Sequence, residues 1–216
     1  MICSKEGIRL KKPEAVALLA YAAKPKDKDR PHLAVVHFLI EGDRCWAYAT
    51  NGHRAIECDG ESDGKHHGGE WLVDRKFLDD AAKVVSGNNT LLLCFSGASL
   101  THASVRDEMD AEVKNFGWPG DAASSQRSFP EVRKIIKIPE HKKRAKCVTL
   151  SSEYMADLKK VALAANRTGI DLYPPEKPDA PLYFRVQADV STTWTGVIMP
   201  IRSDAAEADD EDVAAE

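Results

Sequence analysis

Apolar and polar positions along the chain follow a pattern that repeats at a spacing of about 70 residues. In each repeat, a short apolar run typical of a strand precedes an amphipathic stretch typical of a helix, and further strand-like runs follow. The pattern therefore predicts three strand–helix–strand units. The strand-like runs lie at 7–10, 33–40, 44–50, 71–73, 89–95, 98–105, 147–150, 169–173, 181–188 and 192–201, and the helical faces lie at 13–23, 77–85 and 155–165.

Local signals support the three helices. Pro13 is favoured in the first turn of a helix, and Asp74 and Ser151 or Ser152 are residue types that cap helix N-termini. Gly87 is placed to end the second helix. These signals predict an α+β fold. The three units share too little sequence to prove a duplication, so an unrelated α+β domain is the alternative.

Two segments separate the units, and a third follows them. Residues 108–127 are polar and rich in small residues, which is typical of an exposed excursion. The stretch 204–216 holds seven acidic and no basic residues, which leaves a body with a net charge of about +3. We predict four parts: a domain of two units over 1–127, a basic extended connector over 128–146, a partial domain of one unit over 147–203, and a disordered acidic tail over 204–216.

Composition excludes several classes of protein. The 216 residues are 43% hydrophobic and 30% charged, as in ordinary globular proteins. No apolar run approaches the roughly 18 residues that span a bilayer, and the N-terminal stretch has no secretory signal pattern. The five cysteines are odd in number, widely spread and free of CxxC spacing. We therefore expect a cytoplasmic protein with reduced thiols and no membrane partner.

Catalytic and metal-binding motifs are missing from the sequence. The stretch 60–65 lacks one residue of the phosphate-loop spacing, and His66 stands where a magnesium-binding hydroxyl belongs. His66 and His67 have no cysteine or acid at ligand spacing. A small enzyme built on His53 and Arg54 would lack a positioned nucleophile, acid or metal. We expect no enzymatic activity, no cofactor and no metal.

One string is more specific, namely ATNGHRAIE at 49–57. Asn51 and Gly52 between two strand-like runs predict a hairpin turn. The turn alone does not explain the histidine and arginine that follow it, nor two further phrases, SFPEVRKIIKIP at 128–139 and GVIMPIR at 196–202.

In family order, these three phrases resemble ATDGHRL, FPDYRRVLP and VVMPMR of the bacterial replicative sliding clamp, the β subunit of DNA polymerase III. The resemblance implies a sliding-clamp (DNA clamp) fold with curved antiparallel sheets and helices on one face. It also implies a DNA sliding clamp, a polymerase processivity factor that binds short peptides of replication proteins and holds those proteins at duplex DNA. The alternative is a clamp-like adaptor or decoy that keeps the peptide pocket and never encircles DNA.

The resemblance also assigns residues. The implied peptide-binding pocket consists of Leu33, Thr50, Gly52, His53, Arg54, Ala55, Pro130, Lys134, Ile135, Val197, Met199, Pro200, Ile201 and Arg202. Aliphatic walls suit Leu and Phe anchors, and the two arginines would orient peptide groups at the rim. The implied DNA contacts are Arg75, Lys76, Lys83, Lys159 and Lys160. Contacts of that kind are independent of base sequence and sensitive to salt.

This chain departs from the family in residues and in length. Asn51 replaces an aspartate, Ala55 a leucine, Val132 a tyrosine and Lys134 an arginine. The arginine-to-lysine change loses bidentate hydrogen bonding. Family members have three domains of two units each, whereas this chain has about three units. We expect a homo-oligomer in which half-domains complete each other, with DNA, polymerase peptides and clamp-loader peptides as partners.

Overall fold

The computed structural model of the chain describes residues 1–4, 7–27, 29–63, 68–96, 99–117, 129–138 and 148–201. The strands are β1 (Ile2–Ser4), β2 (Gly7–Lys11), β3 (Val35–Glu41), β4 (Arg44–Thr50), β5 (Arg54–Ser62), β6 (Gly69–Asp74), β7 (Thr90–Ser96), β8 (Ser99–Arg106), β9 (Glu112–Gly117), β10 (Asp171–Tyr173), β11 (Leu182–Gln187) and β12 (Thr193–Ile198). The helices are α1 (Lys12–Tyr21), the 3₁₀ helix η1 (Pro31–Leu33), α2 (Arg75–Val84), α3 (Val132–Ile135) and α4 (Ser152–Ala164).

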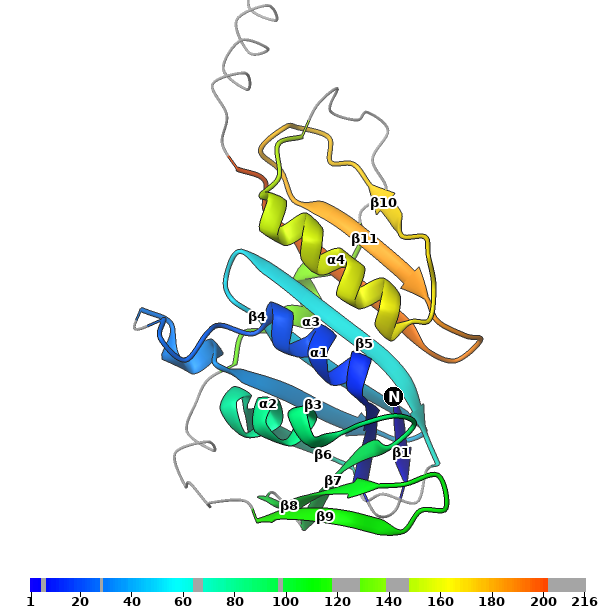
Figure 1. The fold of residues 1–216 in the computed structure, drawn as a ribbon. Coiled ribbons are helices and arrows are strands. Elements are labelled where there is room, and N and C mark those ends of the chain that lie inside the picture. Colours follow the sequence, from blue (N-terminus) through cyan, green and yellow to red (C-terminus); the bar gives the residue numbers. More distant parts are fainter. Residues whose placement is uncertain are drawn as a thin grey trace, which may run out of the picture.

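The twelve described strands form one mixed sheet that curls around the helices (Figure 1). Strand β5 lies at its centre and pairs with β4 along one side. On its other side, residues 54–59 pair with β12 and residues 61–62 pair with β1. The β1–β5 ladder is parallel and the ladders on either side of it are antiparallel. The sheet therefore joins the last described strand of the chain directly to its first half.

Helices α1, α2 and α4 lie together on one face of the sheet, with α1 between the other two (Figure 1). Successive side chains of a strand point to opposite faces, so Ile56 and Cys58 of β5 enter the core beneath these helices. Trp194, Tyr21 and Phe184 are among the largest side chains that are fully buried in this core. Burying each such aromatic side chain contributes about 1.5–3 kcal/mol or more.

The short helix α3 lies on the opposite face of the sheet, behind β4 and β5 in Figure 1. Val132 and Ile136 point into a small apolar cluster with residues of β4, β5 and β12, and we call this group the outer cluster. Its buried members are Trp46, Tyr48, Ala55, Val132, Ile136 and Val197. The outer cluster fixes the segment after Phe129 against the strands that carry the family-like phrases.

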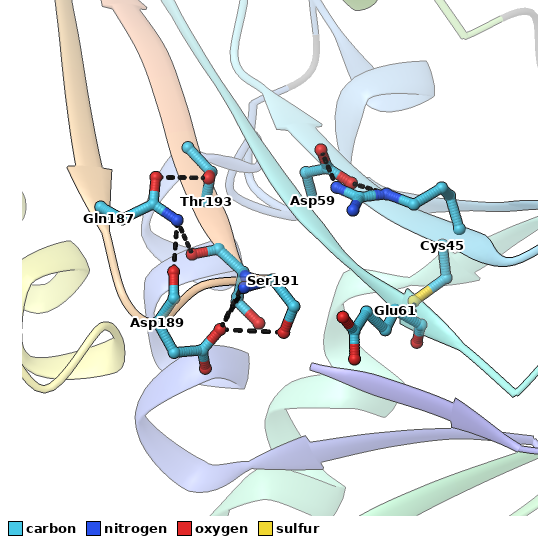
Figure 2. Close-up of polar contacts among 9 residues, drawn as sticks. Cys45, Asp59, Glu61, Gln187, Asp189, Ser191 and Thr193 are labelled. Carbon is cyan, nitrogen blue, oxygen red and sulfur yellow. Dashed lines mark hydrogen bonds and ion pairs between the residues drawn. The ribbon is translucent and has the colours of Figure 1, made fainter.

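The hairpin between β11 and β12 is held by its own side chains (Figure 2). The Asp189 carboxylate accepts hydrogen bonds from the backbone N–H of Ser191 at 2.9 Å and from its hydroxyl at 3.0 Å. The Thr193 hydroxyl donates to the Gln187 side-chain oxygen at 2.9 Å. These bonds fix the register of β12 at one end, and thereby the position of residues 197–201 at the other end.

The structure confirms the predicted α+β class and the predicted helices on one face of a curved sheet, with α3 added on the far face. The three predicted helices correspond to α1, α2 and α4. Asp74 caps α2 as predicted, since its carboxylate accepts from the N–H of Lys76 at 2.8 Å and of Phe77 at 3.3 Å.

Three local predictions are wrong. Residues 148–150 are not a strand, although the Thr149 carbonyl accepts a hydrogen bond from Ile201 N–H at 2.8 Å. Residues 112–117, expected in an exposed excursion, form the edge strand β9. Residues 132–135, expected to be extended, form α3 because Val132 and Ile136 can be buried only if the chain turns back onto the sheet.

Several predictions fall outside the described residues. These are the acidic tail 204–216, positions 128 and 139–146 of the connector, the histidines at 66 and 67, and Arg202. Within the described ranges, no helix has the length and apolar composition needed to cross a bilayer. The same ranges contain no group of three acidic, histidine or cysteine side chains arranged to hold a metal ion.

Candidate functional site

The turn between β4 and β5 is built by the side chains of the ATNGHR phrase. The Thr50 hydroxyl donates to the Arg54 carbonyl at 2.8 Å and accepts from Gly52 N–H at 3.1 Å. The Asn51 side-chain oxygen accepts from the N–H groups of His53 and Arg54 at 3.0 and 3.1 Å. Gly52 has a φ of 86°, which glycine adopts without strain. The phrase therefore encodes a rigid turn.

The Arg54 side chain points away from this turn into the helix side of the sheet. Its guanidinium donates to the Ala20 carbonyl at 2.6 Å and pairs with Asp157 of α4 at 2.7 Å. It also lies over the rings of Tyr21 at 4.7 Å and Tyr154 at 4.4 Å. With 8% of its surface exposed, Arg54 joins α1 to α4. The expected position at an exposed pocket rim is therefore wrong for this side chain.

Asp157 is the acidic partner in this contact. Burial alone would raise the pKa of its carboxyl, but hydrogen bonds from Lys160 and Arg54 and the charges of both hold that pKa below its ordinary value. The carboxylate is therefore charged at neutral pH, and it balances the buried guanidinium.

On the other face of the sheet, three predicted pocket residues form one row across three strands. Thr50 of β4 is opposite Ala55 of β5, and Ala55 is opposite Val197 of β12. Ala55 and Val197 are each 3% exposed, because α3 packs over them as part of the outer cluster. These two residues support the surface from below and offer little area to a ligand.

Exposed apolar residues flank this row. Met199 is 40% exposed and Ile201 is 50% exposed. The Met199 N–H donates to the His53 carbonyl at 2.9 Å, so the chain beyond β12 runs beside the turn. His53 itself is exposed and Pro200 is half-buried. A shallow apolar surface therefore lies where β12 and the turn meet.

Helix α3 borders this surface. Val132 and Ile136 face the sheet, and a rotation of about 100° per residue puts Ile135 on the flank opposite Arg133 and Lys137. Arg133 and Lys137 face the β3 side, because both line a groove with residues of β3. Ile135, which is 50% exposed, thus lies on the side of β5 and β12.

The remaining predicted pocket residues are more scattered. Leu33 is buried in η1, and Pro130 is half-buried ahead of α3. Lys134 is exposed and pairs with Glu131. We define the exposed surface formed by His53, Ile135, Met199 and Ile201 as the apolar surface.

The predicted DNA-contact residues differ from one another in what they contact. Arg75 donates to the Ala22 carbonyl at 2.6 Å, and so binds the C-terminal end of α1. Lys83 pairs with Asp79 at 2.8 Å, and Lys160 pairs with Asp157. Lys76 and Lys159 are exposed. Helices α1, α2 and α4 together carry six basic and five acidic residues, so the three helices as a whole have almost no net charge.

Three of the described cysteines are poor nucleophiles. Cys3, Cys45 and Cys58 are buried and form no disulfide. Burial raises the pKa of the Cys3 thiol to about 11 and that of Cys45 to about 12. The Cys45 thiol donates to the Glu61 carbonyl at 3.2 Å (Figure 2). These groups are protonated core thiols at neutral pH.

The sequence reasoning missed a groove on the β3 side of α3. It has a volume of about 410 Å³, and of the predicted pocket residues only Pro130 and Lys134 line it. The missing signal was α3 itself, because a single helical turn is too short to produce a recognisable hydrophobic period.

Comparisons with known proteins agree with this architecture. No protein-family profile and no curated protein sequence matches the chain. Solved structures do match. The β subunit of DNA polymerase III from Thermotoga maritima aligns with a TM-score of 0.57 and 13% identity over 93% of this chain and 66% of that one. The corresponding subunit from Pseudomonas aeruginosa aligns with a TM-score of 0.57 and 10% identity, over 92% of this chain and 67% of that one.

The DNA polymerase sliding clamp from Bacillus subtilis gives a TM-score of 0.54 and 14% identity, over 91% of this chain and 64% of that one. At such low identity these likenesses concern the fold, and the chain has the sliding-clamp fold. The chain spans about two thirds of the length of the solved structures that it matches.

Proposed function

We propose, from the sliding-clamp fold, that this protein binds short peptides of DNA replication proteins, such as a polymerase or a clamp loader, at the apolar surface. The observation that carries the proposal is the exposure of Met199, whose backbone is bonded to the rigid turn at His53, and of Ile201 two residues further on, with exposed Ile135 on the flank of α3 that faces β5 and β12. Exposed aliphatic residues gathered at one place usually mark a site of interaction. The proposal agrees with the clamp-like phrases that contribute these residues.

The chemistry of this surface suits an apolar peptide anchor. Met199 is flexible and polarizable, so it adapts to either a leucine or a phenylalanine side chain. Ala55 stands where the family has a larger residue, and α3 covers both Ala55 and Val197, so the row beneath the apolar surface forms no deep pocket. Most of the binding energy should therefore come from the exposed residues above the row and little from a deep pocket.

The proposal makes a specific prediction for Met199. Replacing Met199 with alanine should weaken binding of a fluorescently labelled clamp-binding peptide by about tenfold, because truncating a central apolar contact costs about 1–2 kcal/mol. Fluorescence anisotropy titration at fixed salt measures the Kd of both proteins.

Met109→Ala is the matched control. Met109 is 88% exposed in the turn before β9, so its replacement should leave the Kd unchanged. Equal weakening by both variants, or no saturable binding by the wild-type protein, would contradict the proposed function.

Two forms of the function differ in what the protein does with duplex DNA. A clamp that encircles DNA needs a closed ring and a basic inner face. The near balance of charge on α1, α2 and α4 favours the second form, an adaptor that binds peptides and does not encircle DNA. Among the described strands, β6, β9 and β10 each pair with one neighbour only, which supports a homo-oligomer in either form.

Retention on DNA separates the two forms. For an adaptor, we expect gel filtration at moderate salt to leave no more protein on a nicked circular plasmid than on the same plasmid made linear. Native mass spectrometry of the same sample gives the number of subunits. Selective retention on the circle, lost on linearisation, would overturn the adaptor form and assign a ring that encircles DNA.

A further inference from the structure

The groove on the β3 side of α3 is separate from the apolar surface and has no role in the function proposed above. It lies between α3 and the strands β3, β4 and β6 on the face away from the long helices. Its volume of about 410 Å³ falls in the size range of ligand pockets and would hold a few side chains.

The floor of the groove is largely apolar. Leu39 of β3 and Pro130, ahead of α3, are half-buried and offer the apolar area, whereas Tyr48 of β4 and Val132 of α3 also line the groove but are each only 2% exposed. The His37 ring lies 5.5 Å from the Tyr48 ring at the base. Burial lowers the pKa of His37 despite the nearby Glu70 carboxylate, so the imidazole at the bottom of the groove is uncharged at neutral pH. A floor of this kind suits an aliphatic or aromatic side chain.

Charges of both signs line the rim, and most of them are paired. Arg133 lies 3.3 Å from Glu41 and stacks over the Trp46 ring at 4.5 Å. Lys134 pairs with Glu131. A polyanion would meet three glutamates here as well as three cations, and gain little. The mixed rim instead matches a polypeptide, whose amide groups and mixed side chains can use partners of either sign.

Helix α3 connects the groove to the apolar surface. Ile135 lies on one flank of α3, and Arg133 and Lys137 lie on the other. A helix with its side chains is about 10–12 Å across. An extended peptide rises about 3.3 Å per residue, so three or four residues are enough to cross α3. One peptide can therefore reach both sites.

We propose that the groove is a second anchor site for the same peptide partner, and that it takes an apolar or aromatic side chain about four to six residues from the anchor at the apolar surface. The inference rests on the proposed function and adds a requirement to the partner. That partner carries two apolar anchors joined by a short polar spacer that lies over α3.

Labelled peptides test this inference. The short probe carries only the clamp-binding motif, and two extended probes add a tryptophan after a four-residue Gly/Ser spacer at the N-terminal or the C-terminal end. Anisotropy should show that one extended probe binds about tenfold more tightly than the short probe, because a second anchor is held at high local concentration. Leu39→Ala should remove most of this gain and leave the Kd of the short probe unchanged.

Leu163→Ala is the matched control, since Leu163 is 58% exposed on α4, on the other face of the sheet. A photo-crosslinking residue in place of the added tryptophan gives a second readout that does not depend on the folding of a variant. Crosslinks should map to 37–41, 48, 70 or 130–137.

The outcomes separate the two proposals. If the short probe binds but neither extension helps, or if the gain survives Leu39→Ala, the groove inference is wrong and the proposed function stands. Crosslinks that map outside the residues lining the groove also overturn the groove inference. If neither the short probe nor the extended probes bind, both proposals are wrong.

Discussion

Replacing Arg54 with methionine is expected to lower the free energy of unfolding by about 3–5 kcal/mol, the usual cost of removing one partner from a buried ion pair. Methionine keeps much of the apolar length of arginine, so the effect reports on the charge and not on a large cavity. The guanidinium contacts Asp157, the Ala20 carbonyl and two tyrosine rings at once, and methionine satisfies none of the polar partners.

Urea denaturation followed by circular dichroism measures this loss. Arg185→Met is the matched control, because Arg185 also lies over a tyrosine ring, Tyr173 at 5.9 Å, but is exposed. The control should change stability by no more than about 1 kcal/mol. If Arg54→Met costs no more than the control, the contact between α1 and α4 does not depend on Arg54.

The pH dependence of the two proteins gives a second readout. The pKa of Asp157 is lower in the folded protein than in the unfolded chain, partly through Arg54. The stability from this carboxylate is therefore present above its ordinary pKa and is lost as the pH falls through the lowered one. The stability difference between wild type and Arg54→Met should shrink over that acidic range. A difference that stays constant would contradict an ion-pair origin.

Replacing Gly196 with alanine is expected to destabilise the protein by about 2–3 kcal/mol, as in other overpacked cores. A Cβ atom at this position of β12 would lie 2.2 Å from the Phe184 ring and 2.8 Å from the Ala55 carbonyl oxygen. Phe184 is fully buried, so its ring has little room to move. The carbonyl belongs to β5, so relief would have to come from the ladder that joins β12 to β5.

Thermal and urea unfolding of Gly196→Ala test this expectation. Gly169→Ala is the control, because a Cβ there meets no atom within 4 Å. The control should change stability by less than about 1 kcal/mol in either direction. Combining Gly196→Ala with Phe184→Leu should recover part of the loss. An additive double variant would show that the Phe184 ring is not the source of the strain.

The sequence predicted the elements whose signal is long or chemically specific. The three helices were found because each combines a run of apolar residues of helical length or period with a signal at one of its ends, as at Asp74. Strand β9 was missed because nearly all of its residues are exposed, so that its composition looks like that of a loop. Strand β1 is only three residues long, and its pairing with β5 depends on residues far along the chain.

The candidate site was predictable only in part. The phrases located the turn and the end of β12, and the structure places Met199 beside His53. They could not determine the face on which Arg54 lies, because a shift of one residue between turn and strand reverses every side chain that follows. The groove was not predictable, because it depends on the packing of α3 over β4. Helix α3 is too short to show a hydrophobic period in the sequence.

The pairing of β12 with β5 has a consequence for when the apolar surface exists during folding. Residues 54–59 pair with β12, which lies more than a hundred residues further along the chain. Contacts so distant along the chain close late and slowly, because the entropy of loop closure must be overcome first. A partly folded chain would therefore lack the binding surface, and a ligand that recognises the finished surface stabilises the completed fold by mass action. The proposed peptide binding would thus be confined to chains that have folded completely.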